Sequence, residues 1–357
     1  MKIIHCSDLH FDSKMESNLP FRKAQERNNE LITTFSRMVS FAIKEGVEII
    51  LIAGDIFDAD RITSRTADYF LDVVREAPTI HFLLLRGNHD GSRRAFAGRK
   101  IPANLKFFNE NWTFYSFGDV VIAGVELNRD NYRLIYDHLQ LSPETINIVM
   151  MHGQESTQFG ENNVCLPSLQ GKHIHYLALG HIHSYKKERL DTEGDYCYSG
   201  CLEGRGFDEC GEKGFVLLHL KGRRIESQFV PFARRRLYDI SVDITSLTTA
   251  HEIHRAIKQV AEGISKDSLI KFTLTGNYTL DTHKDLRFLT QLLSDEFYFV
   301  KVDDESQLAL ENESYEYDVS LKGEFIRTVL ATELADSDKD IIINAGLQAL
   351  SGEEIVI

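Results

Sequence analysis

Residues 47–58 read VEIILIAGDIFD, in which seven mostly apolar residues lead directly into a glycine and two aspartates. An apolar run of this length is typical of a strand buried on both faces, as in a parallel sheet. We therefore predict a strand over 47–53 that ends at Gly54, with Asp55 and Asp58 just beyond its carboxyl end. In open α/β sheets this is the position at which ligands bind.

The neighbouring sequence alternates between buried strands and amphipathic helices. Apolar runs cover 2–6 and 80–85, while residues 21–44 and 63–75 carry apolar side chains three and four positions apart, as helices do. This β-α-β-α-β order predicts an α/β layered domain. Short β-type runs separated by glycine-rich turns over 185–231 predict antiparallel strands that complete the sheet.

Length and charge together predict two domains. The chain has 357 residues, which is more than one typical core needs, and its net charge is −14. Residues 237–357 hold 10 basic and 23 acidic residues, whereas residues 1–236 are nearly balanced, with 30 and 31. We expect an α/β domain over 1–236 and a small acidic α+β domain over 237–357. Because negative charge repels phosphate at long range, a polyanion would bind the first domain.

Composition also excludes several classes of protein. No stretch approaches the ~18 apolar residues that a membrane span needs, and the apolar run at the N-terminus breaks too early for a secretory signal. The five cysteines are scattered and form no CxxC pair. We interpret them as reduced thiols of a cytoplasmic protein, which excludes a disulfide scaffold and a zinc ribbon.

Four further polar motifs follow predicted strands in the same way as Gly54-Asp55. They are Asp8-Leu9-His10, Gly87-Asn88-His89-Asp90, His152-Gly153 and Gly180-His181-Ile182-His183. Together the five motifs supply these candidate ligands: Asp8, His10, Asp55, Asn88, His152, His181 and His183. Carboxylates, imidazoles and an amide without a thiolate suit Mn²⁺, Fe or Zn²⁺. Seven ligands are too many for one ion and sufficient for two, if one carboxylate bridges.

The spacing within the motifs supports this interpretation. In an extended segment residues i and i+2 point the same way, so Asp8 and His10 can chelate one ion, and His181 and His183 can reach the same region. Two ions about 4 Å apart would activate water and clamp a phosphate for in-line attack. Each motif alone is weak, but all five in this order predict a two-metal phosphoesterase.

These motifs resemble the signature of the calcineurin-like metallophosphoesterase superfamily, which reads DxH, GD, GNH, H and GHxH. The resemblance covers residues 1–236 and implies a four-layer α/β fold, in which two packed mixed β-sheets are flanked by helices, with a small C-terminal capping domain. More narrowly, the sequence resembles the bacterial SbcD family of DNA-repair exonucleases. That narrower resemblance also includes Tyr198-Ser199-Gly200, Gly206-Phe207-Asp208-Glu209 and Lys213-Gly214.

The resemblance implies how the ligands divide between two divalent metal ions, of which Mn²⁺ is the expected one. The first ion would be held by Asp8, His10, Asp55 and His183. The second ion would be held by Asp55, Asn88, His152 and His181. Asp55 would therefore bridge the two ions.

The resemblance further implies roles for residues beside these ligands. His89 corresponds to the family's catalytic histidine and would protonate the leaving oxygen. Asp58 lies where related phosphatases carry an acid paired with that histidine. Arg86, Arg93 and Arg94 belong to a basic cluster and are candidates for contacts to backbone phosphates.

Two functions stay open at this stage. The first is an Mn²⁺-dependent DNA exonuclease or endonuclease in DNA repair that works with an SMC-like ATPase, and for which a homodimer is an option. The second is a phosphatase or cyclic-nucleotide phosphodiesterase that acts on a small phosphoester. The net acidity and the lack of interleaved aromatic and basic residues favour the second. The amphipathic segments 321–334 and 338–350 would be core helices of the second domain or would dock the ATPase.

Overall fold

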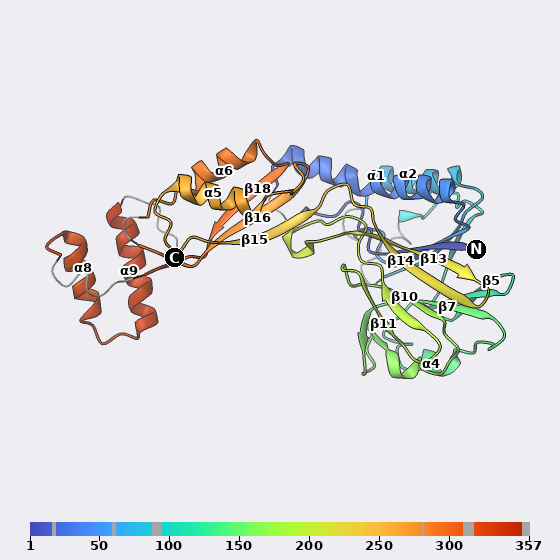
Figure 1. Cartoon of the computed structure of the whole chain (residues 1–357). Coiled ribbons are helices and arrows are strands. Elements are labelled where there is room, and N and C mark those ends of the chain that lie inside the picture. Colours follow the sequence, from blue (N-terminus) through green and yellow to red (C-terminus); the bar gives the residue numbers. More distant parts are fainter. Residues whose placement is uncertain (16–18, 59–61, 88–94, 280–281, 310–317, 352–357) are drawn as a thin grey trace. The chain divides into compact units, whose positions relative to one another are not determined.

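The computed structural model describes residues 1–15, 19–58, 62–87, 95–279, 282–309 and 318–351 (Figure 1). The chain forms two compact units, Met1–Leu237 and Tyr238–Ile357. Each unit is described by itself below. No helix among the described residues is long and apolar enough to cross a lipid bilayer.

The first unit contains two mixed sheets, each with six described strands. In lateral order the first sheet consists of β14 (Arg224–Pro231), β13 (Gly214–Lys221), β1 (Lys2–Cys6), β2 (Ile49–Ala53), β3 (His81–Leu85) and β4 (Leu105–Phe107). Strands β1 to β4 are parallel, and β13 and β14 complete the sheet in antiparallel orientation, as the sequence predicts.

The second sheet follows the same plan. In lateral order it consists of β11 (Lys186–Arg189), β12 (Asp195–Tyr198), β10 (Tyr176–Gly180), β7 (Ile146–His152), β6 (Val120–Gly124) and β5 (Thr113–Phe117). The four central strands are parallel, and β5 and β11 are antiparallel edge strands. A short parallel pair, β8 (Gln154–Ser156) and β9 (Asn163–Cys165), lies outside the sheet.

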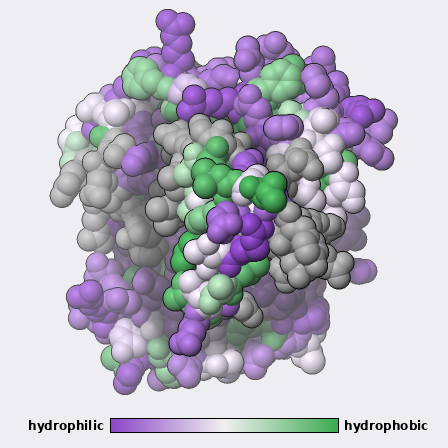
Figure 2. All heavy atoms as spheres, turned by 90° about the vertical axis from the view of Figure 1, so that its left-hand side faces the viewer, coloured by the Kyte–Doolittle hydropathy of each residue, from purple (hydrophilic) through white to green (hydrophobic). Residues whose placement is uncertain are grey.

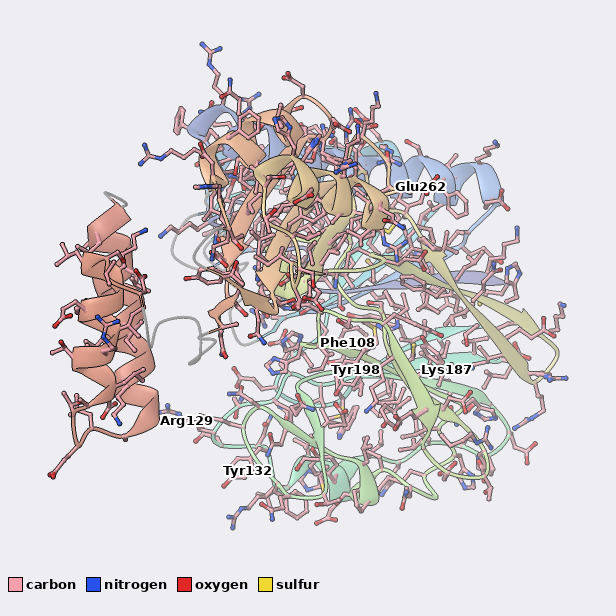
Figure 3. The ribbon with its side chains drawn as sticks, turned by 60° about the vertical axis from the view of Figure 1, so that its left-hand side comes forward. Phe108, Arg129, Tyr132, Lys187, Tyr198 and Glu262 are labelled. Carbon is pink, nitrogen blue, oxygen red and sulfur yellow. The ribbon has the colours of Figure 1, made fainter. Side chains whose placement is uncertain are left out.

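Alternation along the central strands explains the uninterrupted apolar run at 47–53. Ile50 and Ile52 of β2 pack in a cluster with helices α1 (Phe21–Glu45) and α2 (Ser64–Glu76). The neighbouring residues of β2 belong instead to a cluster between the two sheets, together with Phe108, which Figure 3 shows in the interior. Both faces of β2 are therefore buried.

The outer face of the second sheet carries a third hydrophobic cluster. Val149 and Leu177 of this sheet pack there with Tyr136 of the short helix α4 (Ile135–His138). The order of layers is thus helices, sheet, sheet and a thinner outer layer. This arrangement confirms the predicted α/β fold of two packed mixed sheets flanked by helices.

The second unit is built around a small three-stranded sheet. Its elements in chain order are β15 (Leu237–Asp243), α5 (Ala250–Val260), β16 (Leu269–Thr275), β17 (Asn277–Tyr278), α6 (Leu286–Ser294), β18 (Phe299–Asp304), β19 (Gln307–Leu308), α8 (Leu321–Leu330) and α9 (Asp336–Ser351). Strands β16 and β18 are parallel, and a capping box between Thr249 and Glu252 begins α5. The sheet packs on α5 and α6 through a hydrophobic cluster of its own.

Helices α8 and α9 pack against each other through a small cluster that includes Ile326 and Ile343. Other apolar side chains of this pair face solvent, since Leu321 is 71% and Ile341 is 59% exposed. Figure 2 views these helices from outside and shows hydrophobic residues among hydrophilic ones. The pair therefore buries one face of each helix and leaves apolar side chains exposed.

A buried histidine makes the stability of the first unit dependent on pH. The His5 side chain is buried, its Nδ1 lies 3.0 Å from the Tyr176 hydroxyl, and burial lowers the pKa of His5 to about 3. In the unfolded chain a histidine titrates near 6.5, so below that pH the unfolded state binds a proton that the folded state does not. The contribution of neutral His5 is therefore present above pH 6.5 and is lost, at about 1.4 kcal/mol per pH unit, as the pH falls toward 3.

We expect the free energy of unfolding to fall between pH 7.5 and pH 5.5 by about 1.4 kcal/mol more in the natural protein than in His5→Phe. Urea unfolding of both proteins at the two pH values measures this difference. An equal pH dependence of the two proteins would show that His5 is not held neutral in the folded state.

Candidate metal centre

The predicted ligands lie at one edge of the two sheets because strands β1, β2, β7 and β10 end there. The backbone continues to pair just beyond the strand ends, since the Asp8 N–H donates to the Gly54 carbonyl oxygen at 3.0 Å. In the second sheet His152 lies opposite Gly180 in the register. The two sheets also meet here, because the Nδ1 atom of His152 lies 2.9 Å from the carbonyl oxygen of Ala53.

This close approach of the sheets requires glycine at two positions. A methyl group on Gly180 would overlap the carbonyl oxygen of Ala53, and one on Gly54 would overlap the His152 ring. Gly54 also has a φ of 98°, in the region that other residues rarely adopt. The glycines before Asp55 and His181 thus make room for the opposite sheet.

Backbone strain is concentrated at the ligands. Among the described residues seven non-glycine residues have positive φ, and four of them are predicted ligands: Asp8 (53°), His10 (44°), Asp55 (50°) and His181 (104°). Such conformations cost on the order of 1–3 kcal/mol each and are characteristic of ligand-binding positions. They turn the side chains at the strand ends toward one another.

Two overlapping groups of side chains can each hold a metal ion. In the first group, one ligand atom from each of Asp8, His10 and His183 lies within 4.8 Å of the others. The Nε2 atoms of the two imidazoles are 3.2 Å apart, and the Nε2 atom of His183 lies 3.8 Å from an oxygen of Asp8. Asp8 and His10 are buried, whereas His183 is partly accessible.

The second group consists of Asp8, Asp55 and His152, again with ligand atoms within 4.8 Å of one another. One oxygen of Asp55 lies 3.3 Å from the Nε2 atom of His152 and 3.9 Å from that of His10. Asp55 therefore lies between the two groups, at the place that a bridging ligand would take. Asp8 belongs to both groups as well, which the sequence did not indicate.

His181 stands beside the second group without belonging to it. The centroid of its ring lies 5.4 Å from that of the His152 ring. Its backbone N–H donates to both carboxylate oxygens of Asp8, at 3.0 and 3.1 Å. Burial and the neighbouring His152 together lower the pKa of His181.

The electrostatics of the site fit a divalent cation. Burial by itself would lower the pKa of His152, but the carboxylates of Asp55 and Asp8 outweigh it and raise this pKa to about 9. The buried carboxylates thus hold a proton on a neighbouring imidazole for want of another positive charge. Metal ions bind to deprotonated ligands and take the place of such protons. The donor set of carboxylate oxygens and imidazole nitrogens matches Mn²⁺, Fe or Zn²⁺.

Several predicted site residues lie outside the described residues. They are Asn88, His89, Arg93 and Arg94. The expected pairing of Asp58 with His89 therefore stays a prediction. The described partner of Asp58 is a different histidine, because Oδ1 of Asp58 lies 2.6 Å from Nδ1 of His10. Although burial raises the pKa of Asp58, hydrogen bonds to His10 and Ser13 lower it below its usual value.

Arg86, a candidate phosphate contact, is paired with a carboxylate. Its Nε and Nη2 atoms donate to the two oxygens of Glu126, at 2.7 and 2.6 Å. Both side chains are largely buried. Arg86 follows a strand of the first sheet and Glu126 follows one of the second, so the pair joins the two sheets. A phosphate that binds Arg86 would have to compete with this carboxylate.

Sequence reasoning missed three residues that position the ligands. Glu209 and Arg205 contact the far side of His183. Tyr198, labelled in Figure 3, donates to the carbonyl oxygen of Gly153 at 2.9 Å and so fixes the backbone that follows His152. Two of the three, Glu209 and Tyr198, belong to segments that carry the SbcD resemblance. That signal marked the segments without indicating a role.

Comparison with known proteins agrees with this geometry. The chain is 27% identical to the uncharacterized metallophosphoesterase YhaO of Bacillus subtilis, over 74% of this chain and 69% of that protein. It is 24% identical to the DNA double-strand break repair protein Mre11 of Aeropyrum pernix, over 74% and 69%. It is 21% identical to a component of the nuclease SbcCD of Staphylococcus saprophyticus, over 99% and 94%.

The profile of the calcineurin-like phosphoesterases matches residues 1–185, which is more than half of the chain. This segment contains every candidate ligand, and the described ones lie together at one edge of the two sheets. The chain therefore belongs to the calcineurin-like phosphoesterase family.

Proposed function

We propose that this protein is a metal-dependent phosphodiesterase that cleaves DNA, as an exonuclease or endonuclease in DNA repair. The observation that carries the proposal is the pair of overlapping carboxylate–imidazole groups that share Asp8, with Asp55 between them. Similarity to a double-strand break repair protein and to a nuclease component supports DNA as the substrate.

We assign the ligands as the family pattern implies. Asp8, His10, Asp55 and His183 would hold one ion, and Asp55, Asn88, His152 and His181 the other. Mn²⁺ is the proposed metal, with Fe and Zn²⁺ as alternatives that the donor set also suits. Such an ion pair supplies the positive charge that binds a phosphate and activates water. The strained backbone and the buried hydrogen bonds described above would hold the ligands in place for it.

The proposal includes partners. DNA would bind the first unit, and an SMC-like ATPase is the proposed protein partner, as the similarity along 94% of an SbcCD component suggests. Helices α8 and α9 expose apolar side chains that such a partner would cover. We further propose that the second unit caps the nuclease unit, that the chain is able to form a homodimer, and that it works in the cytoplasm.

A second function is favoured by the charge of the chain. The net charge of −14 and the neutralisation of Arg86 by Glu126 both reduce attraction for DNA. A phosphatase or cyclic-nucleotide phosphodiesterase would use the same metal centre on a small phosphoester and would need no basic channel.

One experiment separates the two functions. The purified full chain is incubated with Mn²⁺ and either linear duplex DNA or bis-p-nitrophenyl phosphate, at low salt, with and without the ATPase partner. We expect both substrates to be cleaved and both activities to stop when EDTA is added. Hydrolysis of the small diester without degradation of DNA, even with the partner present, would refute the nuclease proposal and support the second function.

The role assigned to His89 gives a separate prediction. The His89→Gln variant should lose activity by at least about a hundredfold, because its side chain no longer protonates the leaving oxygen. Its metal content, measured by mass spectrometry of the metals after gel filtration, should equal that of the natural protein. A variant that lost one metal would show instead that His89 is a ligand.

A further inference from the structure

The two imidazoles of the first metal group are each held from behind by a carboxylate. The Nδ1 atom of His183 lies 2.7 Å from Oε1 of Glu209, and the Nδ1 atom of His10 lies 2.6 Å from Oδ1 of Asp58. An imidazole whose Nδ1–H donates to a carboxylate has its Nε2 lone pair available for a metal ion. The two Nε2 atoms face each other 3.2 Å apart, which agrees with this orientation.

Arg205 fixes the Glu209 carboxylate in position. Its Nη2 atom donates to Oε1 of Glu209 at 2.6 Å, and its own backbone N–H donates to Oε2 at 2.8 Å. The Nη1 atom of Arg205 also donates to the hydroxyl of Ser13 at 3.2 Å. Since Glu209 is only 4% exposed, these contacts decide its position.

The same contacts keep Glu209 charged. Burial alone would raise the pKa of this carboxyl, but hydrogen bonds to His183 and Arg205 lower it well below its usual range. Lys213 supports the ligand from its backbone, because its Nζ atom donates to the carbonyl oxygen of His183 at 2.7 Å. His183 is therefore oriented at both its ring and its backbone.

The second metal group has no such partner for its described histidine ligand. The Nδ1 atom of His152 faces the carbonyl oxygen of Ala53, which is a neutral acceptor. A carboxylate behind an imidazole makes it a more basic ligand than a carbonyl does. The histidines of the first group should therefore bind a cation more strongly.

We propose that Glu209, held by Arg205, is a positioning residue that makes the first metal position the tighter of the two, so that it fills first. This inference rests on the ligand assignment of the proposed function and adds an order of binding to it. Removal of a carboxylate behind a metal-binding histidine typically weakens binding by about 10–100-fold. The loss should fall on the first position, because Glu209 contacts His183 and no described ligand of the second.

Titration of the metal-free full chain with Mn²⁺ in a calorimeter tests the proposal. The natural protein should bind two ions in two steps of different affinity. Glu209→Gln, which keeps the shape of the side chain, should weaken the tighter step by about 10–100-fold and leave the weaker step within about threefold. Asp208→Asn is the matched control, because it removes the same charge from the adjacent, exposed position and should change neither step.

Two outcomes would overturn the inference: equal affinities in the natural protein, or a Glu209→Gln variant that weakens both steps alike. If Glu209→Gln does not fold, Arg205→Lys tests the same link, because a lysine cannot hold both the carboxylate and Ser13, and the same selective weakening is expected. The result is independent of substrate. Two ordered binding steps without DNA cleavage would refute the nuclease and leave this inference standing.

Discussion

Replacing Asp55 by asparagine is expected to remove both metal ions and to abolish hydrolysis of every phosphoester substrate. Asp55 is 1% exposed, and one of its oxygens lies 3.3 Å from Nε2 of His152 and 3.9 Å from Nε2 of His10. No other carboxylate oxygen described near the site approaches one imidazole of each group in this way. A neutral amide at this position keeps the volume but takes away the negative charge that two cations would share.

The size of the effect follows from what surrounds the ligand. Changes to residues behind a ligand typically weaken metal binding by about 10–100-fold, so loss of a bridging ligand should exceed about 100-fold at each position. The charge of Asp55 also raises the pKa of His152, and without it burial would keep this imidazole neutral and the group less attractive to a cation. Both effects act in the same direction.

Calorimetric titration with Mn²⁺ and the bis-p-nitrophenyl phosphate assay measure the two expected losses. Asp119→Asn is the matched control, since this aspartate is exposed in the turn between β5 and β6 and should leave both measurements unchanged. If Asp55→Asn still bound one ion tightly, Asp55 would serve a single position, and the assignment of a bridging carboxylate would be wrong.

The position of the site could be predicted from the sequence because it depends on local patterns. The apolar run at 47–53 indicates a buried parallel strand, and the carboxyl ends of parallel strands meet at one edge. Polar residues placed directly after such runs, as Asp55 and His152 are, must then lie near one another. The structure describes both at that edge, on strands of different sheets.

The partners of these side chains could not be predicted, because they depend on how separate segments pack. Arg86 was grouped with a basic cluster, yet its guanidinium is held by Glu126 from the other sheet. Asp58 was expected to pair with His89, but its described partner is His10. Neither contact has a fixed spacing along the chain, so no periodicity reveals it. Glu209 was likewise visible only as part of a family segment.

Glycine shows the same limit. The glycine before Asp55 was predicted to allow a sharp turn, and its φ of 98° agrees with this role. Gly180 has no such conformation among the positive-φ residues described, and its requirement is space for the Ala53 carbonyl of the facing sheet. A turn is a local property, whereas close packing of two sheets is not.

A second large effect is expected at Glu203, where alanine should destabilise the first unit by about 3–5 kcal/mol. Glu203 is 2% exposed and accepts hydrogen bonds from the hydroxyl of Thr34, at 2.7 Å, and from the backbone N–H of Arg234, at 2.5 Å. Its other oxygen lies 3.3 Å from Nη2 of Arg27, which is also buried. Removing one partner from a buried charge network leaves the others uncompensated, which accounts for a loss of this size.

The network extends beyond this pair and joins three segments. Arg27 also pairs with Glu30, and Glu30 receives the Nε–H of Arg235 at 2.9 Å. Helix α1, the loop that carries Glu203 and the segment at the end of the first unit are thus held by the same charges. Loss of Glu203 should loosen all three at once.

Urea unfolding followed by fluorescence measures this effect in the full chain. The single tryptophan, Trp112, lies in the first unit, so its emission reports that unit directly. Glu26→Ala is the matched control, because Glu26 also belongs to α1 and pairs with Arg235 but is half-exposed, and such surface pairs contribute about 1 kcal/mol or less. If both variants lost the same small amount, burial would add nothing to the network. A loss confined to Glu203→Ala would show that its carboxylate stabilises the first unit because it is buried among fixed partners.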